Sequence, residues 1–143
     1  MALLINDGFI EFWFDCGSGS GSIKSKEAVT LNIWNTITIY RHLWDAWIVL
    51  NQASKVYGRS KGIFSRMTFR EPVFLGGSGN MTGLNKKLPV LNGFNGCIRK
   101  FVSNGHVNKF EYLPAGDVSK GFDISNIHLD NINLKFIYIF NYR

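Results

Sequence analysis

The chain has 143 residues, a length that suits one domain and leaves no room for a second well-packed core. Hydrophobic residues make up 45% of it and charged residues 18%, which describes a globular chain and excludes a disordered tail. The formal net charge is +6, from 16 Lys and Arg against 10 Asp and Glu. Such a surface favours polyanions such as sulfated glycans, anionic lipid or nucleic acid, although a soluble domain with solvated lysines explains the excess equally well.

The N-terminus carries a short apolar run, MALLI at residues 1–5, which Asn6 and Asp7 interrupt. This run is too short for a signal peptide, and no segment approaches the roughly 18 consecutive apolar residues that a membrane helix requires. We therefore expect no membrane insertion, and a secreted protein would carry its export signal upstream of this chain.

Residues 8–15 alternate with period two, so that Phe9, Glu11, Trp13 and Asp15 share one face of a strand. The opposite face, with Ile10, Phe12 and Phe14, is the better core candidate. Glycines and serines at residues 17–21 then predict a turn, and residues 22–25 restart the sheet as the second strand of a hairpin.

Four further segments are predicted to be strands. Residues 35–41 and 46–50 predict a second hairpin, because β-branched Thr and Ile suit a pleated surface. Residues 71–75 and 94–102 predict two more strands, each bounded by Gly or Asn. Short strands at this spacing predict an all-β fold, an antiparallel sandwich or barrel, and not a βαβ sheet. Its expected interior is Ile10, Phe12, Phe14, Ile37, Ile39, Val73, Leu75 and Ile98.

Aromatic and cysteine side chains complete this description. Trp34, at a strand start, is predicted to be a core residue, whereas Trp44 and Trp47 flank a loop and are expected to be partly exposed. Cys16 and Cys97 permit at most one internal disulfide, and their number alone does not fix the redox compartment.

Several motifs in order carry a resemblance to a known family. They are LINDGFIEF at residues 4–12, FDCGSG at 14–19, WNTITIYR at 34–41, EPVFLGG at 71–77 and GFNGCIR at 93–99. Together they resemble the C-terminal three-quarters of a laminin G-like domain, of the type found in the basement-membrane proteoglycan perlecan and in agrin. The resemblance implies a concanavalin A-like jelly roll that is incomplete here, because domains of this family start earlier.

The same resemblance implies a domain boundary and a disulfide. Residues 1–126 resemble the partial domain, and residues 127–143 are interpreted as a C-terminal tail of unknown origin. The family pattern has a cysteine after residues 121–126 that bridges to the position of Cys97, but position 127 is Ile. Cys97 therefore lacks its usual partner, and Cys16 is a poor substitute, because the family places these two positions on separate parts of the sandwich.

Many members of the family bind one calcium ion at the rim of the sandwich. The resemblance implies that Cys16 and Arg66 would supply backbone carbonyls and that Thr68 takes the place of a second Asp or Asn. The first acidic ligand would lie upstream of Met1. Since Ca²⁺ prefers charged oxygen ligands, these departures predict that the chain holds no calcium and needs no cofactor.

The sequence contains no constellation that predicts catalysis. Glu11 and Asp15 share a strand face but lie roughly 13 Å apart by the strand rise, too far for a retaining glycosidase pair, and they are interpreted as solvent-facing acids. His42, His106 and His128 are not at zinc-ligand spacing. No Gly-rich phosphate loop opens a helix. We therefore expect a binding module and not an enzyme.

Two functions follow from the resemblance. The first is an adhesion module of a secreted, basement-membrane protein that binds sulfated glycosaminoglycans, glycosylated receptors such as dystroglycan or other matrix proteins, and not nucleic acid. The alternative is a structural spacer without a ligand of its own. The candidate glycan-binding residues are Lys24, Lys26, Arg59, Lys61, Lys86 and Lys87, of which the pair at 86 and 87 is expected to dominate. The sequon at residues 80–82 predicts glycosylation at Asn80.

Overall fold

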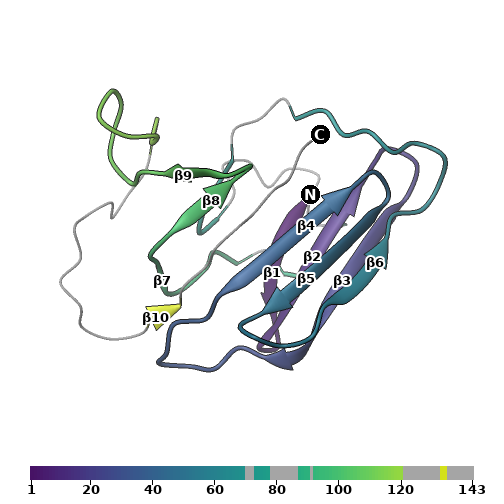
Figure 1. Cartoon of the computed structure of the whole chain (residues 1–143), viewed down its shortest axis with the longest axis horizontal. Coiled ribbons are helices and arrows are strands. Elements are labelled where there is room, and N and C mark those ends of the chain that lie inside the picture. Colours follow the sequence, from purple (N-terminus) through teal and green to yellow (C-terminus); the bar gives the residue numbers. More distant parts are fainter. Residues whose placement is uncertain (70–72, 78–86, 91, 121–132, 135–143) are drawn as a thin grey trace.

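Two antiparallel sheets of three strands each face one another in the computed structural model, which describes residues 1–69, 73–77, 87–90, 92–120 and 133–134 (Figure 1). The first sheet has the order β1-β2-β3, formed by Ala2–Asn6, Phe9–Asp15 and Ser20–Ala28. The second has the order β4-β5-β6, formed by Ile37–His42, Asp45–Leu50 and Val56–Arg59. The described residues contain no helix, so the all-β, antiparallel prediction is confirmed. None of them forms an apolar helix that could cross a membrane.

Both predicted hairpins are present. The β2–β3 pair runs from Phe9↔Ala28 to Asp15↔Ser20, and the β4–β5 pair from Ile37↔Leu50 to His42↔Asp45. A third hairpin, between β1 and β2, was missed. Its turn consists of Asp7 and Gly8, with φ values of 50° and 81°. Asp-Gly is a favoured pair for such two-residue turns, so the signal was in the sequence.

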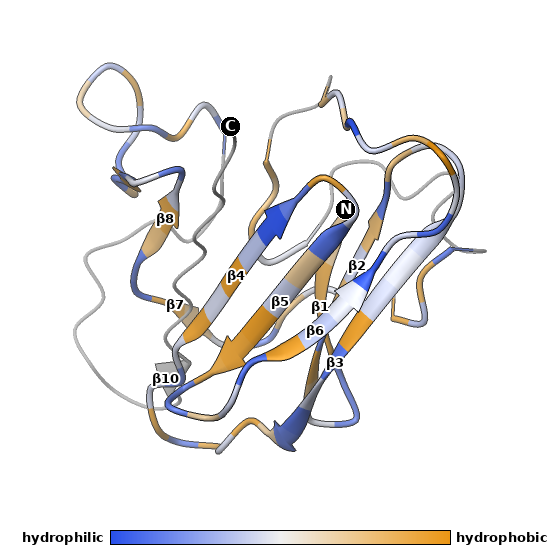
Figure 2. Ribbon diagram, turned by 45° about the vertical axis from the view of Figure 1, so that its right-hand side comes forward, coloured by the Kyte–Doolittle hydropathy of each residue, from blue (hydrophilic) through white to orange (hydrophobic). Residues whose placement is uncertain are grey.

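The core lies between the two sheets. Ile10, Phe12 and Phe14 from β2 and Ile37 and Ile39 from β4 are at most 2% exposed, which confirms these five predicted core positions. Four further core side chains come from β3 and β5: Ile23, Ala46, Ile48 and Leu50. Figure 2 shows hydrophobic and hydrophilic residues alternating along β4, as period-two burial requires.

The two sheets approach each other most closely at a seam between β3 and β6 (Figures 1 and 2). A Cβ atom at Gly21 would overlap the backbone of Arg59, and one at Gly58 would overlap the side chain of Ile23. Glycine at these two positions therefore lets the strands come together. We call this side of the sandwich the β3–β6 flank.

The outer face of the second sheet is held by stacked aromatic rings. Tyr40 and Trp47 are cross-strand partners whose ring centroids lie 5.5 Å apart, and Lys55 places its ammonium 4.5 Å from the centroid of Trp47. Such pairs stabilise neighbouring strands. Because both neighbours stack on it, Trp47 is half-buried, and Trp44 is also half-buried.

The C-terminal half departs from the sequence-based expectation. Val73 and Leu75 are 67% and 38% exposed and lie outside any strand, so their assignment to the core was wrong. Residues 71 and 72 of the same predicted strand lie outside the described residues. The strand expected over residues 94–102 is instead two short strands, β7 (Cys97–Ile98) and β8 (Phe101–Ser103). Ile98 is partly buried against the core.

Two small elements accompany these strands. β9 (His106–Asn108) pairs with β8, and β10 (Asn133–Leu134) pairs in parallel with β7. The two family motifs at residues 71–77 and 93–99 also touch, because the amide of Phe94 donates to the carbonyl of Gly76 at 2.6 Å. The division of the chain at residue 126 stays a prediction.

The outer face of the first sheet buries a carboxylate. Glu11 is only 7% exposed, so its interpretation as a solvent-facing acid was wrong. It accepts hydrogen bonds from Trp13 Nε1 at 2.9 Å and from Asn6 Nδ2 at 3.1 Å, and Lys24 Nζ lies 3.3 Å away. Burial by itself raises the pKa of Glu11, but the hydrogen bonds and charge of Trp13, Asn6 and Lys24 outweigh it, and the pKa lies below its usual value.

Replacing Phe12 by Ala should lower the free energy of unfolding by about 3–5 kcal/mol, because the ring is fully buried between the sheets. Tyr57 is 70% exposed on β6, so Tyr57→Ala is a suitable control and should cost at most about 0.5 kcal/mol. Urea unfolding of the three proteins gives both values. Equal losses in the two variants would contradict the assignment of the core.

Replacing Glu11 by Gln should change how stability depends on pH. A carboxyl whose pKa is lowered in the folded state stabilises that state above its unfolded pKa of about 4.3, and this contribution disappears as the pH falls through the folded pKa. The difference in unfolding free energy between the parent protein and Glu11→Gln should therefore be larger at neutral pH and shrink below about pH 4. A difference that stays constant over this range would show that the ionised carboxylate does not stabilise the sheet.

Candidate functional site

Three loops meet at one end of the sandwich, at residues 16–19, 43–44 and 60–66. The thiol of Cys16, which follows β2, lies 3.3 Å from Ser60 Oγ and 3.7 Å from the carbonyl of Leu43. The amide of Ser60 donates to the carbonyl of Trp44 at 2.9 Å. These bonds tie the ends of β2, β4 and β6 to one another. We call this end of the molecule the loop rim.

The last of these loops is fixed by its contacts with the first. The amide of Lys61 donates to the carbonyl of Gly19 at 3.1 Å, and the amide of Phe64 donates to Ser18 Oγ at 2.9 Å. The first loop is itself held by Asp15, whose Oδ1 accepts the amides of Gly17 and Gly19 at 2.7 and 3.2 Å. The rim loop 60–66 is therefore preorganised, although it belongs to no strand.

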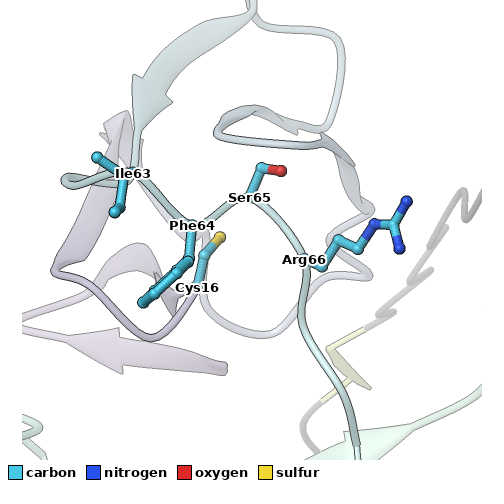
Figure 3. A pocket seen from close by; sticks show the side chains of 5 residues that line it. All are labelled: Cys16, Ile63, Phe64, Ser65 and Arg66. Atoms are coloured by element: carbon cyan, nitrogen blue, oxygen red, sulfur yellow. The ribbon is translucent and has the colours of Figure 1, made fainter.

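A shallow cavity of about 310 Å³ opens at this rim, lined by Cys16, Ile63, Phe64, Ser65 and Arg66 (Figure 3). Arg41, which comes from β4, donates through Nη2 to Cys16 Sγ at 2.9 Å and to the carbonyl of Ser65 at 2.8 Å. Figure 3 shows Ile63 and Phe64 on one side of the loop and the Arg66 guanidinium on the other. The cavity thus combines apolar side chains with positive charge.

The residues at this cavity do not fit a calcium ion. The structure does bring Cys16 and Arg66 to one cavity, as the family resemblance implied, but Thr68 is exposed and does not line it. No carboxylate lines it either, and the described part of the chain has no cluster of three or more His, Cys, Asp or Glu. A dication needs anionic oxygens, whereas Arg41 brings a positive charge. That this chain holds no calcium stays a prediction.

Both cysteines are free. Cys16 is buried at the loop rim, and Cys97 is half-buried in β7. That these two positions lie on separate parts of the sandwich, and that Cys97 lacks its usual partner, stay predictions. The thiol of Cys16 contributes hydrogen bonds that hold Arg41 and Ser60.

Two of the candidate glycan-binding residues are held by neighbours within the protein. Lys24 is paired with Glu11 and lies 4.8 Å from the ring centroid of Phe9. Arg59 Nη1 lies 3.1 Å from Asp45 Oδ1, and its guanidinium covers the ring of Trp44 at 5.5 Å. Both cations are still half or more exposed, with side-chain exposures of 50% and 62%.

The other candidates differ in their surroundings. Lys26 on β3, Lys61 in the rim loop and Lys87 are exposed, and none of them forms an ion pair with another described residue. Lys86 and the predicted glycosylation site Asn80 lie outside the described residues. The structure therefore brings Lys24, Lys26, Arg59 and Lys61 to the β3–β6 flank and leaves the pair at 86 and 87 undecided.

Sequence reasoning missed a second cavity, at the end of the sandwich opposite the loop rim. It measures about 780 Å³ and is lined by Glu27, Ile33, Trp34, Thr36, Asn51, Gln52 and Ala53. Trp34 was predicted to be a core residue, but it is only half-buried, with the guanidinium of Arg99 at 5.6 Å from its ring centroid. The fully buried residue is Asn35, whose amide bonds the backbone of Thr30 and Ile33. Asn35 is buried because its amide bonds the loop before β4, at Thr30 and Ile33. The period-two alternation of a strand does not predict such a contact.

The groups weighed for catalysis and zinc binding remain apart. Asp15 is exposed and holds the first rim loop, whereas Glu11 is buried on the outer face of the first sheet. His42 is exposed, and His106 pairs with Asp117 at 3.3 Å. His128 lies outside the described residues. The described side chains therefore form no paired carboxylates and no histidine cluster.

Comparisons with known proteins agree with this architecture. The family model of the laminin G domain matches residues 1–106. Pikachurin of Bos taurus is 32% identical over 124 residues, 87% of this chain and 12% of that protein. The basement membrane-specific heparan sulfate proteoglycan core protein of Mus musculus is 32% identical over 95 residues, 66% of this chain and 2% of that protein. Protocadherin Fat 1 of Homo sapiens is 31% identical over 129 residues, 86% of this chain and 3% of that protein.

No solved structure matches the chain. The chain spans only 12% of the length of the pikachurins that it matches. The family model covers both three-stranded sheets and the whole loop rim. The chain therefore belongs to the laminin G domain family.

Proposed function

We propose that this chain is an adhesion module of a secreted extracellular matrix protein and that it binds sulfated glycosaminoglycans or a glycosylated cell-surface receptor such as dystroglycan. Membership of the laminin G domain family supports an adhesive role, as does the similarity to a basement membrane proteoglycan core protein. The module acts by binding and catalyses no reaction. A location in the basement membrane is part of the same proposal.

The observation that carries the glycan proposal is the row of cations along the β3–β6 flank. Lys61 lies beside Gly19 at the start of β3, and Lys26 lies seven residues further along that strand. The strand rise of about 3.3 Å per residue makes this row roughly 23 Å long. A sulfated chain that runs along it meets several cations at once.

The positive charge of the cations on the β3–β6 flank favours an anionic partner. Each exposed ion pair contributes little, but several that act on one multivalent chain add to a useful affinity. Lys24 and Arg59 already pair with Glu11 and Asp45, so the flank cations that have no ion-pair partner among the described residues are Lys26 and Lys61. Lys86 and Lys87 add two further positive charges in the loop region that the sequence favours for recognition.

Replacing Lys86 and Lys87 by Ala should lower the salt concentration at which the protein elutes from a heparin column. Two fewer counterions are released on binding, so the slope of log affinity against log salt should flatten by about one to two. The charge-matched control is Lys100→Ala with Lys109→Ala, two exposed lysines away from the flank. The pair Lys26→Ala with Lys61→Ala measures the contribution of the flank on the same column.

An elution position that Lys86→Ala with Lys87→Ala leaves unchanged would reject the dominance of this pair. If the flank variant alone elutes early, the glycan lies along β3 and β6. If the unmutated protein is not retained at all, the chain is better described as a structural spacer without a ligand of its own.

Asn80 should carry an N-linked glycan when the protein is expressed through the secretory pathway. Its sequon, Asn80-Met81-Thr82, follows the glycines at residues 76 and 77, and a sequon in a surface loop of a secreted chain is accessible to the transferase. Mass spectrometry of the peptide before and after enzymatic deglycosylation measures the occupancy, with Asn80→Gln as the control. An unmodified Asn80 in the secreted protein would contradict this prediction.

A further inference from the structure

We propose that the loop rim docks on an anionic lipid bilayer and that Ile63 and Phe64 enter the interfacial region of that bilayer. This inference is distinct from glycan binding, because it depends on the apolar pair Ile63 and Phe64, which takes no part in the glycan proposal, although Lys61 belongs to both sites. Three features of the rim carry it: the exposure of two consecutive apolar side chains, the rigidity of their loop, and the positive charge around them.

Ile63 is 80% exposed and Phe64 is 56% exposed. Single exposed apolar residues are ordinary on protein surfaces, but these two are consecutive and lie at the tip of a rim loop. Neither belongs to a strand, so their exposure is not a consequence of strand alternation. Figure 3 shows Ile63 and Phe64 beside each other, with the Arg66 side chain extending away from them.

The loop holds these side chains in place before any partner arrives. The amides of Lys61 and Phe64 bond to the first rim loop at 3.1 and 2.9 Å. On the other side, Arg41 donates to the carbonyl of Ser65 at 2.8 Å. A loop fixed in this way loses little conformational freedom when it binds, which favours a small contact surface.

The charge around the tip is positive. Lys61 and Arg66 flank the two apolar residues, and neither forms an ion pair with another described residue. Asp45 pairs with Arg59, and Asp15, which accepts amides of the first rim loop, is outnumbered by Lys61 and Arg66. Negatively charged headgroups would complement Lys61 and Arg66, each of which contributes to the attraction near a charged surface.

A lipid surface fits this combination better than a folded protein or a glycan does. A stable protein interface needs roughly 800 Å² from each partner, much more than two side chains over a shallow cavity provide. A sulfated glycan satisfies the cations but leaves Ile63 and Phe64 in water. A bilayer interface accommodates a few apolar side chains and binds cations beside them. A search for long apolar segments does not detect such a site, because only two consecutive residues form it.

The test is co-sedimentation of the full chain with vesicles of phosphatidylcholine alone and of phosphatidylcholine mixed with phosphatidylserine. The protein should bind the mixed vesicles, and Ile63→Ser with Phe64→Ser should weaken this binding by about tenfold or more. Lys61→Gln with Arg66→Gln should reduce the preference for the mixed vesicles. The matched control is Leu31→Ser with Ile33→Ser, which removes two apolar side chains of similar exposure, 69% and 50%, from the opposite end of the sandwich.

Several results would overturn the proposal. These are failure of the parent protein to bind the mixed vesicles, equal binding by the Ile63 and Phe64 variant, and an equal loss in the Leu31 and Ile33 control. If the parent protein and the Ile63 and Phe64 variant both fail to bind vesicles, and only the variant loses binding to cells, the rim contacts a protein and not a lipid. Thermal unfolding checks that the variants fold, which exposed positions should permit. Vesicle binding by the Ile63 and Phe64 variant is measured without heparin. The lipid proposal can therefore be rejected while the glycan proposal stands, and the reverse also holds.

Discussion

Burial of the inner faces of β2 and β4 against each other is the interaction on which the rest of the structure depends. Among the described residues each of the two sheets has three strands, and the buried apolar side chains lie on the faces that the sheets turn to each other, so those of one sheet need those of the other. Phe12 and Phe14, with ring centroids 5.1 Å apart, fill the space between the sheets. The close approach at Gly21 and Gly58 then fixes β3 beside β6. Everything at the loop rim is positioned by these contacts.

The loop rim forms because three strands of the sandwich end at the same side of the molecule. β2, β4 and β6 end at the same side of the molecule, so the loops that follow them bond to one another through Cys16, Ser60 and Trp44. A half-buried arginine, Arg41, crosses between these loops and supplies positive charge there. With apolar and cationic groups at the rim and no carboxylate lining its cavity, the rim is suited to anionic partners and not to a metal.

Glu11 shows that the strand face on which a residue lies does not determine whether its side chain is buried. Alternation correctly places Glu11 on the face opposite Phe12, but it does not say what covers that face. Trp13 on the same strand and Lys24 on the next strand enclose the carboxylate, and their bonds hold its pKa down despite the burial. Lys24, which the sequence analysis proposed for glycan binding, therefore also forms an ion pair within the first sheet.

Period-two alternation and the order of the family motifs determined the all-β class, the two hairpins, the core positions on β2 and β4 and the family. These features are local, because the alternation of a strand fixes which side chains share a face. The same reasoning was wrong for Val73 and Leu75, since an alternating segment is buried only where another sheet face lies opposite it. It also placed Trp34 in the core, whereas the neighbouring Asn35 is the buried residue.

Tertiary structure alone decided which loops meet at the rim, that Lys24, Lys26, Arg59 and Lys61 share one flank, and that Ile63 and Phe64 are exposed together. The physical reason is that these arrangements depend on contacts between residues far apart in the chain, such as Gly19 with Lys61, which no local pattern specifies. The sequence by itself determines what each strand offers to a neighbour, and the packing of the two sheets determines which neighbour it meets.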